Sequence, residues 1–519
     1  MIKQRKIIKH ISNVTLGTFI SRILGYIRDM LVAELFGAGF IADAFYAAYR
    51  IPNLFRRLLG EGSISASFIP VLTEYIETKD KEETHELINV IFTILLTIVL
   101  LITIIGIIFA KPITKLITWG FFPDKIELTA SLTRILFPYM IFVCMAALML
   151  GILNSLKSFF IPAVAPALLN ISEIVYVLFF SAMISLPEMK IKWLAVSILI
   201  GGFGQYLIQQ ICVLKKGYIV KLKYDFNHPG LKKIFLLMIP ITLGFSVDQI
   251  NAFVDTICGS FLADGSIAAL YYSNRLMQLP LALFGLAITT VALPTMSSGV
   301  AKNDINKVKE TLNFSLRMIF FTLIPCMFGL VVLGLPIVKL LFERGRFDAK
   351  ASEMTYSALA FYSLGLIAFS STKVLSSVFY SFKTTKLPFK IAVICMMINV
   401  ILNIVLMRPL RVGGLALATT ISSWINCTLL LYYLRKKIGG IGGRKIFVSF
   451  LKITGISIIM SLFAYLLFII EYPYYILKVC IPIIFAVIFY IYLSKILKIE
   501  EYNIVQTIFV KKDISIDTE

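Results

Sequence analysis

The sequence predicts an all-α polytopic membrane protein with about fourteen transmembrane helices. Of its 519 residues, 59% are hydrophobic and only 15% are charged. Soluble globular chains carry about 25% charged residues, so this composition lies well outside their range. Long uncharged segments recur along the chain, and one half of the sequence resembles the other.

The uncharged segments have the length that a membrane-spanning helix needs. About 20 apolar residues in a helix cross roughly 30 Å of hydrocarbon. Clean examples occupy residues 88–110, 137–156, 193–214 and 413–434. When less clean segments of helical length are added, the expected total is about fourteen.

The two halves of the chain carry matching motifs. AFYAAYRIPNL and ALYYSNRLMQL align so that Arg50 falls on Arg275, and SLKSFFIP and SFKTTKLP align so that Lys157 falls on Lys383. Both pairs are displaced by roughly 225 residues, which indicates an internal repeat of the kind found in alternating-access transporters. Because each copy holds an even number of expected spans, the two copies have the same orientation in the membrane.

The repeat predicts how the chain is divided. Its two copies form six-helix bundles, and two further transmembrane helices and a short tail follow them. The expected boundaries are residues 1–220 for the first bundle, 225–438 for the second, 446–494 for the two extra helices and 495–519 for a cytoplasmic tail.

The net charge of +21 is better explained by membrane topology than by nucleic-acid binding. The basic residues lie mainly in short loops, such as residues 215–233, 301–309 and 434–445, rather than on one soluble face. A cytoplasmic N-terminus places these loops together on the inner side, as the positive-inside rule requires. We therefore expect both termini in the cytoplasm and no nucleic-acid partner.

The sequence lacks motifs for ATP-driven or hydrolytic chemistry. It contains no GxxxxGK[ST], HExxH or GxSxG, and its seven cysteines lie in apolar segments without metal-ligand spacing. A membrane glycosyltransferase acting on polyprenyl phosphates would also need arginines, but no loop is long enough to build its donor-binding domain. A purely structural scaffold would not need arginines inside the membrane. The sequence therefore favours a transporter over an enzyme.

Charged residues interrupt the first two expected helices. A charge at the bilayer centre costs roughly 2.5 to 3.5 kcal/mol on insertion scales, so such residues usually face a partner or a watery cavity. Ser21 and Arg28 share one face of the first helix, and Arg22 and Asp29 lie on the adjoining face. In the second helix the polar residues follow steps of three and four, namely Asp43, Tyr46, Arg50, Asn53 and Arg57.

These charges favour an anionic substrate in a central cavity. Arginines outnumber carboxylates among them, so the missing anion is expected to come from the substrate. The guanidinium is planar and always charged, which suits phosphate or pyrophosphate. One structural alternative places Arg22, Arg56 and Arg57 at helix ends, where they extend to the interface. Another has Asp29 pair with Arg28 or Arg22 only to hold helices together.

A known family carries similar motifs. SRILGYIRDMLVAELFGAGFIADAFYAAYRIPNLFRRLLGEG, residues 21–62, closely resembles the N-terminal signature of the lipid II flippase family called MurJ or MviN. That family belongs to the multidrug/oligosaccharidyl-lipid/polysaccharide (MOP) exporter superfamily. FPYMIFVCMAALMLGILNSLKSFFIPAVAPALLN and YYSNRLMQLPLALFGLAITTVALPTMS resemble it too, so the likeness spans nearly the whole chain.

The resemblance implies a multi-pass flippase of the bacterial cytoplasmic membrane. Such a protein moves the undecaprenyl-pyrophosphate-linked peptidoglycan precursor, lipid II, from the inner to the outer face. We therefore expect lipid II and membrane lipids as partners and a monomeric transporter. The main alternative, within the same superfamily, is an exporter of another lipid-linked oligosaccharide or a drug/cation antiporter. A cationic drug would require net carboxylate in the cavity, whereas the charges here are mainly arginines.

The resemblance also implies which residues line the cavity. Its arginines would bind the pyrophosphate and the sugar-peptide headgroup, and the last two helices would make a groove for the lipid tail. The matching positions are Ser21, Arg22, Arg28, Asp29, Asp43, Asn53, Arg56, Arg57 and Arg275. Family members often have Asp and Glu where this chain has Asn274 and Gln278, which leaves the headgroup contacts near Arg275 open.

Energy coupling has two candidate explanations. The first is sodium binding, because a set of oxygen-bearing residues resembles sodium sites proposed in this family. These residues are Asp255, Asn399, Asn403 and Thr419. A second carboxylate expected at Asn403 is absent, and the alternative role for the set is hydrogen bonding between helices. The second explanation is the membrane potential, because one charge crossing 100 mV is worth roughly 2.3 kcal/mol. No other cofactor is expected.

Overall fold

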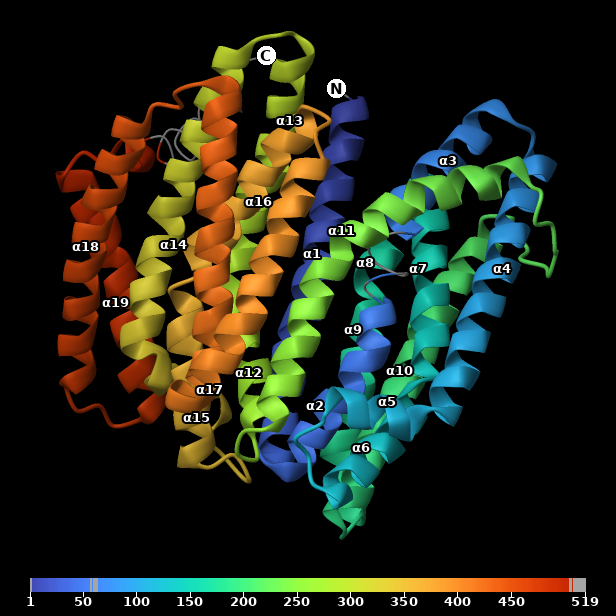
Figure 1. Cartoon of the computed structure of the whole chain (residues 1–519), viewed down its shortest axis with the longest axis horizontal. Coiled ribbons are helices and arrows are strands. Elements are labelled where there is room, and N and C mark those ends of the chain that lie inside the picture. The colour runs from blue at the N-terminus through green and yellow to red at the C-terminus, as the bar shows by residue number, and fades with distance from the viewer. Residues whose placement is uncertain (1, 57, 59–63, 504–505, 507–519) are drawn as a thin grey trace. The chain divides into compact units, whose positions relative to one another are not determined.

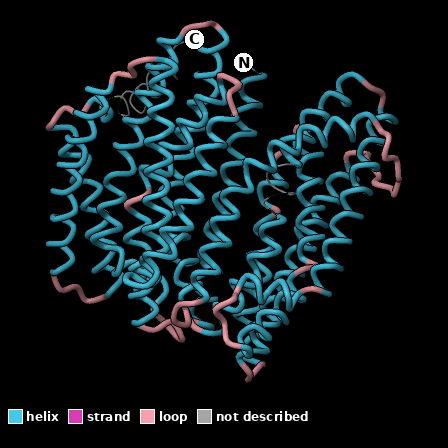
Figure 2. Tube along the Cα trace, viewed as in Figure 1, coloured by secondary structure: helices cyan, strands magenta, loops and turns pink. Residues whose placement is uncertain are grey.

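The computed structural model describes residues 2–56, 58, 64–503 and 506, and these form helices joined by short loops (Figures 1 and 2). No strand occurs within these ranges, so the predicted all-helical fold is confirmed. Nine helices in this part of the chain are long and apolar enough to cross a membrane, or up to ten if a bent pair is one span. The multi-pass character is confirmed, whereas the total of fourteen spans stays a prediction.

Residues 1–268 and 344–348 form the first of two compact units. Its elements are α1 (Ile2–Phe36), α2 (Phe40–Phe55), α3 (Ser65–Thr78), α4 (Lys81–Ile108), α5 (Ala110–Ile117), α6 (Pro123–Leu136), α7 (Tyr139–Ser155), α8 (Phe160–Val164), α9 (Pro166–Val175), η2 (Tyr176–Phe180), η3 (Ser181–Met183), α10 (Pro187–Lys215) and α11 (Pro229–Ser260). α7 and α9 both pack against α10, α9 also packs against α1, and α2 packs on α6.

Residues 269–343 and 349–519 form the second unit. Its elements are α12 (Ser266–Pro280), which begins in the first unit, η4 (Leu281–Leu286), α13 (Ala287–Ala301), α14 (Ile305–Phe342), α15 (Ala349–Ser363), α16 (Leu366–Ser381), α17 (Lys386–Ile438), α18 (Gly443–Ile469) and α19 (Tyr475–Ile496). α18 packs against α14 and α19, and α17 packs against α15 and α16. Figure 1 shows α18 and α19 side by side along α14.

Helix starts follow local signals in the sequence. Pro123, Pro187 and Pro229 each occupy the first turn of a helix, where the missing N–H costs nothing. The Asp80 side chain accepts a 2.7 Å bond from the Glu83 N–H at the start of α4, which is the usual role of an N-cap carboxylate. The helical boundaries are thus set largely by local chemistry.

α17 is bent in its middle and consists of two arms. Arg411 follows Pro409 by two residues and has φ of 50° and ψ of −126°, which are not helical values. A Cβ on Gly414 would lie 2.1 Å from the carbonyl oxygen of Leu406, so a glycine is needed where the chain turns back. The bend lets one continuous segment supply two arms of the bundle.

Lys157 and Lys383, the two positions aligned by the repeat, lie in turns of the same type. Both residues have positive φ, 58° and 55°, which is uncommon for lysine. After each of them the next N–H reaches back to a carbonyl five residues earlier, from Ser158 to Leu153 at 2.8 Å and from Thr384 to Phe379 at 2.9 Å. These are Schellman turns that end α7 and α16 in the same way. The boundaries of the proposed bundles stay a prediction.

Candidate functional site

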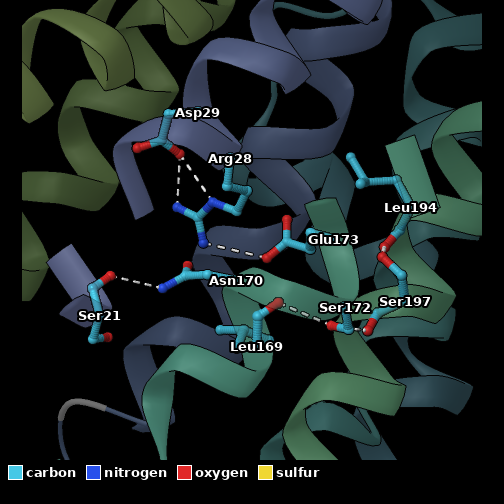
Figure 3. Close-up of polar contacts among 9 residues, drawn as sticks. All are labelled: Ser21, Arg28, Asp29, Leu169, Asn170, Ser172, Glu173, Leu194 and Ser197. Carbon is cyan, nitrogen blue, oxygen red and sulfur yellow. Dashed lines mark hydrogen bonds and ion pairs between the residues drawn. The ribbon is translucent and has the colours of Figure 1, made fainter. Parts of the chain in front are cut away.

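Arg28 in α1 lies between two carboxylates of the first unit (Figure 3). Its Nε and Nη2 donate to Oδ1 of Asp29 at 3.0 and 2.7 Å, and its Nη1 donates to Oε1 of Glu173 at 3.2 Å. The Arg28, Asp29 and Glu173 side chains are only 12%, 2% and 5% exposed. One buried cation is therefore shared by two anions.

Glu173 belongs to α9 and was not among the residues predicted from the sequence. It lies inside the apolar span 160–183, and it is 145 residues away from Arg28. The sequence feature that could have identified Glu173 is its position as a single carboxylate in an apolar span, because such a carboxylate is expected to face a cation. Nothing in the sequence says which cation that is.

α9 is held close to both of its neighbours, and this positions Glu173. Asn170 Nδ2 donates to the carbonyl of Ser21 in α1 at 3.0 Å, and Ser172 Oγ donates to the carbonyl of Ser197 in α10 at 2.8 Å (Figure 3). A Cβ on Gly201 of α10 would lie 2.2 Å from Ser172 Oγ, so the two helices approach as closely as a glycine allows.

The Arg28 cluster changes one premise of the sequence analysis. The arginines were expected to outnumber carboxylates, with the missing anion supplied by the substrate. At Arg28 the protein itself supplies two carboxylates: Asp29 is the next residue of α1, and Glu173 of α9 is the one whose ion pair joins two helices. The assignment of Arg28 to substrate binding stays a prediction.

Asp43, at the start of α2, is a buried anchor for the start of α12. Its Oδ2 accepts from the Gly265 N–H at 2.7 Å and from Lys125 Nζ at 2.9 Å, and its Oδ1 accepts from the Ala268 N–H at 2.8 Å. Lys125, which the sequence analysis missed, is buried and also bonds Asp264 at 2.7 Å. These bonds satisfy the otherwise open N–H groups of a helix start.

The remaining predicted residues of the first unit have varied surroundings. Arg56 Nε donates to Oδ1 of Asn53 at 2.8 Å, and both side chains are half-buried. Arg22 is exposed and Ser21 is half-buried. Arg57 lies outside the described residues. The polar stripe of α2 can therefore be followed from Asp43 only as far as Asn53.

Arg275 lies half-buried in the second unit, on α12. One turn of this helix carries the two positions that depart from the family pattern. There Gln278 Nε2 donates to Oδ1 of Asn274 at 2.5 Å. One hydrogen bond thus joins these two neutral amides beside Arg275, and they add no negative charge to this part of α12.

Three of the four predicted sodium ligands meet in the second unit. Asn399 donates to the hydroxyls of Thr419 and Ser422 at 3.3 and 3.4 Å, and it accepts from Asn403 at 3.1 Å. This network links the two arms of α17, and both asparagines are fully buried. Asp255 belongs to α11 of the first unit. Asn399, Asn403, Thr419 and Ser422 are all neutral, so this set suits hydrogen bonding between the two arms of α17.

Comparisons with known proteins give a consistent result. A model of the family described as "Lipid II flippase MurJ" matches residues 32–486. A protein named "Probable lipid II flippase MurJ" from Vibrio cholerae is 40% identical over 426 residues, covering 80% of this chain and 81% of that protein.

Solved structures resemble the fold as well. One described as "Lipid II flippase MurJ, inward closed conformation" has a TM-score of 0.78 at 30% identity and covers 93% of this chain and 98% of that one. An inward-facing MATE family multidrug resistance transporter of the MOP superfamily has a TM-score of 0.71 at 13% identity, over 83% of this chain and 98% of that one. At that identity the second match shows only a shared fold.

Proposed function

This chain belongs to the lipid II flippase MurJ family, and we propose that it moves lipid II from the inner to the outer face of the bacterial cytoplasmic membrane. The observation that carries the proposal is the family match over residues 32–486. The apolar helices supply the multi-pass scaffold that such transport needs. The chain then acts as a monomeric transporter and not as an enzyme.

The proposed orientation puts both termini in the cytoplasm. Its support is the positive-inside rule, because the lysine-rich and arginine-rich loops fall on one side when the helices alternate. The loops expected on the other side, such as residues 37–39 and 261–265, carry no lysine or arginine. Lipid II would then enter from the side on which it is made.

The headgroup is proposed to bind the arginines, with Glu173 as an internal competitor. A guanidinium has five N–H donors, and three of those of Arg28 bond carboxylates. The bond to Glu173, at 3.2 Å, is the longest of the three. A pyrophosphate that approaches Arg28 therefore displaces Glu173 first and leaves the Asp29 contacts in place. Arg275 and the arginines of α2 supply the remaining charge.

Coupling is proposed to rest on the membrane potential acting on Arg275 and the arginines of α2, because two carboxylates offset the charge of Arg28. The Asn399 network offers hydrogen bonds between neutral groups and supplies no carboxylate of its own to a sodium ion. One charge moved across 100 mV changes the free energy by roughly 2.3 kcal/mol, which is enough to bias the return of an unloaded transporter.

The proposed function is tested in cells depleted of their own flippase. Wild type, Arg28→Ala and Arg275→Ala are expressed at equal membrane levels, and lipid II accessible at the outer face is measured. Arg134→Ala removes an exposed arginine of α6 and serves as the control. We expect wild type and the control to restore export and the two other variants to fail. No restoration by correctly inserted wild type would indicate a different lipid-linked oligosaccharide.

A further inference from the structure

The segment between α10 and α11, residues 218–227, forms a strap along the side of α4 (Figure 1); residues 218–225 are extended and 226–227 form a turn. The N–H groups of Ile219, Lys221 and Lys223 donate to His85 Nε2 at 3.0 Å, Asn89 Oδ1 at 2.8 Å and Thr93 Oγ1 at 2.8 Å, respectively. Two residues of extended chain advance about 6.6 Å and four helical residues about 6.0 Å, so the two elements stay in register.

Both ends of the strap are fixed. The ring of Tyr218 lies 4.8 Å from the ring of His85, centre to centre. At the other end the ring of His228 lies 6.0 Å from that of Tyr75 in α3. Between them Lys223 bonds Glu86 of α4 at 2.6 Å. The strap is therefore a docked element of the first unit.

The outer side of the strap is apolar and basic. Leu222, Tyr224 and Phe226 alternate along it and are 67%, 61% and 68% exposed, and the Tyr224 hydroxyl also lies 3.2 Å from Thr97 Oγ1 of α4. The lysines Lys216 and Lys221 are exposed too. Aromatic and long apolar side chains mixed with lysines are typical of the boundary between bilayer and water.

The backbone of the strap needs acceptors on its outer side. Successive N–H groups of an extended chain alternate in direction. Since those of Ile219, Lys221 and Lys223 point to α4, those of Val220 and Leu222 point away from it. In hydrocarbon such groups cost several kcal/mol each, whereas lipid phosphates and interfacial water accept their bonds. The first part of the strap, which bonds His85 and Asn89 at the start of the expected span 88–110, thus fits the headgroup layer.

α4 itself supplies the reason for choosing lipid as the occupant. Beyond the strap the same helix exposes Leu101, Ile104, Ile105 and Ile108, which is a face suited to acyl chains. A surface continuous with this face, and rich in lysine, is complementary to anionic headgroups. A soluble acidic protein would not extend onto the apolar part of α4.

We propose that the strap binds anionic phospholipid headgroups of the cytoplasmic leaflet, with Leu222, Tyr224 and Phe226 inserted at the acyl boundary and Lys216 and Lys221 on the phosphates. This inference rests on the proposed orientation and is independent of which substrate is transported. It makes the connection between α10 and α11 a site where the composition of the membrane acts on the protein.

Lipid affinity is the first test. Purified full-length chain is titrated with phosphatidylglycerol and bound lipid is counted by native mass spectrometry. The double variant Lys216→Gln/Lys221→Gln is compared with Lys302→Gln/Lys307→Gln, which removes two exposed lysines from another basic segment. Each lysine near an anionic surface is worth about fivefold in affinity, so we expect about 25-fold weaker binding for the strap variant. Equal effects in both variants, or none, would overturn the proposal.

The second test measures how deep the strap lies in the membrane, and it remains valid if the lysine variants misfold. The three native tryptophans are replaced by phenylalanine and Phe226→Trp is introduced. In nanodiscs with lipids brominated near the headgroup, we expect blue-shifted emission that bromine quenches. Quenching by aqueous acrylamide with no effect of bromine would mean that the strap faces water, where a protein partner is the alternative, and the lipid proposal fails. Lipid II export is measured in a separate assay, so the two proposals fail separately.

Discussion

At the residue scale, Arg28 shows how this chain keeps a charge inside a membrane. The guanidinium is bonded by two carboxylates that are almost fully buried. Removing one carboxylate changes the charge of the cluster more than its shape, because Gln has nearly the same volume as Glu. The cluster is therefore the place where single substitutions report most directly on headgroup binding.

The first prediction concerns Glu173→Gln. If pyrophosphate displaces Glu173 from Arg28, removing the competing charge is expected to tighten the binding of undecaprenyl pyrophosphate by about tenfold, or roughly 1.4 kcal/mol. Binding to purified protein is measured by native mass spectrometry, with Glu188→Gln, an exposed glutamate of α10, as the control. Unchanged affinity would show that phosphate does not compete at Arg28.

The second prediction concerns the buried pair of Lys125 and Asp43. Lys125→Met leaves Asp43 buried without its cation, and breaking a buried pair in this way costs about 3 to 5 kcal/mol. The double variant Asp43→Asn/Lys125→Met removes both charges and is expected to be more stable than Lys125→Met alone. Unfolding of the purified protein in mixed detergent is the measurement. A double variant less stable than either single one would contradict this account.

At the element scale, α9 and α10 pack closely because glycine occupies their contact. A Cβ on Gly201 would lie 2.7 Å from the Cα of Leu169. One turn later, a Cβ on Gly204 would meet its nearest atom, in Leu168, at 3.8 Å. Gly201 therefore has no room for a methyl group, whereas Gly204 of the same helix does.

The third prediction compares alanine at these two positions. Gly201→Ala forces α9 away from α10, and overpacking of this kind costs about 1 to 3 kcal/mol. Because α9 carries Glu173, the same variant is expected to weaken the Arg28 contact and alter lipid export. Gly204→Ala has room and gains up to about 1 kcal/mol of helix propensity. Equal unfolding midpoints for the two variants would sink this explanation.

The fourth prediction concerns the segment that follows α19. Arg317 of α14 bonds Glu500 and Glu501, and Glu501, which is buried, also accepts from Ser449 of α18. Arg317→Gln is expected to speed hydrogen exchange of residues 498–503, because it leaves Glu501 buried without its cation. Arg444→Gln, at the exposed start of α18, is the control. If the exchange rates of residues 498–503 do not change, Arg317 is not the residue that anchors this segment.

The same contact has a pH dependence. The hydrogen bond from Arg317, together with its charge, lowers the pKa of Glu500 below its usual 4.5. A carboxyl whose pKa is lowered on folding stabilises the fold above its unfolded pKa, and this contribution is lost as the pH falls through the lowered value. The anchoring is therefore complete at neutral pH and weakens only below about pH 4.5.

At the scale of the whole molecule, the number of membrane crossings decides which loops share a side. Between residues 302 and 471 lie α14, the bent pair of α15 and α16, both arms of α17, and α18. If each arm of α17 crosses the bilayer, these two positions are on opposite sides. If α17 crosses once, they are on the same side.

The fifth prediction uses cysteine labelling in a chain whose native cysteines are replaced. Glu471→Cys is expected to react with an impermeant maleimide on intact cells. Lys302→Cys is expected to react only after the membrane is opened, because it lies in a basic loop on the inner side. Labelling of both from the same side would contradict the proposed topology and the count of fourteen spans.

The sequence by itself determined the fold class and the places where charge enters the membrane. Apolar runs of spanning length predicted an all-helical membrane protein, and motifs in residues 21–62 indicated the family. The repeat also aligned Lys157 with Lys383, where the structure has the same turn twice. These features depend on composition and short-range periodicity, which a linear sequence records directly.

Only the tertiary structure decided what each intramembrane charge touches. Glu173 is 145 residues from Arg28, and Lys125 is 82 residues from Asp43. No spacing rule connects such residues, because their approach depends on how α9 packs on α1 and how α6 packs on α2. The sequence indicated which positions carry charges that need partners. The packing of the helices determined the partners, because ionic contacts act over a few ångströms in space.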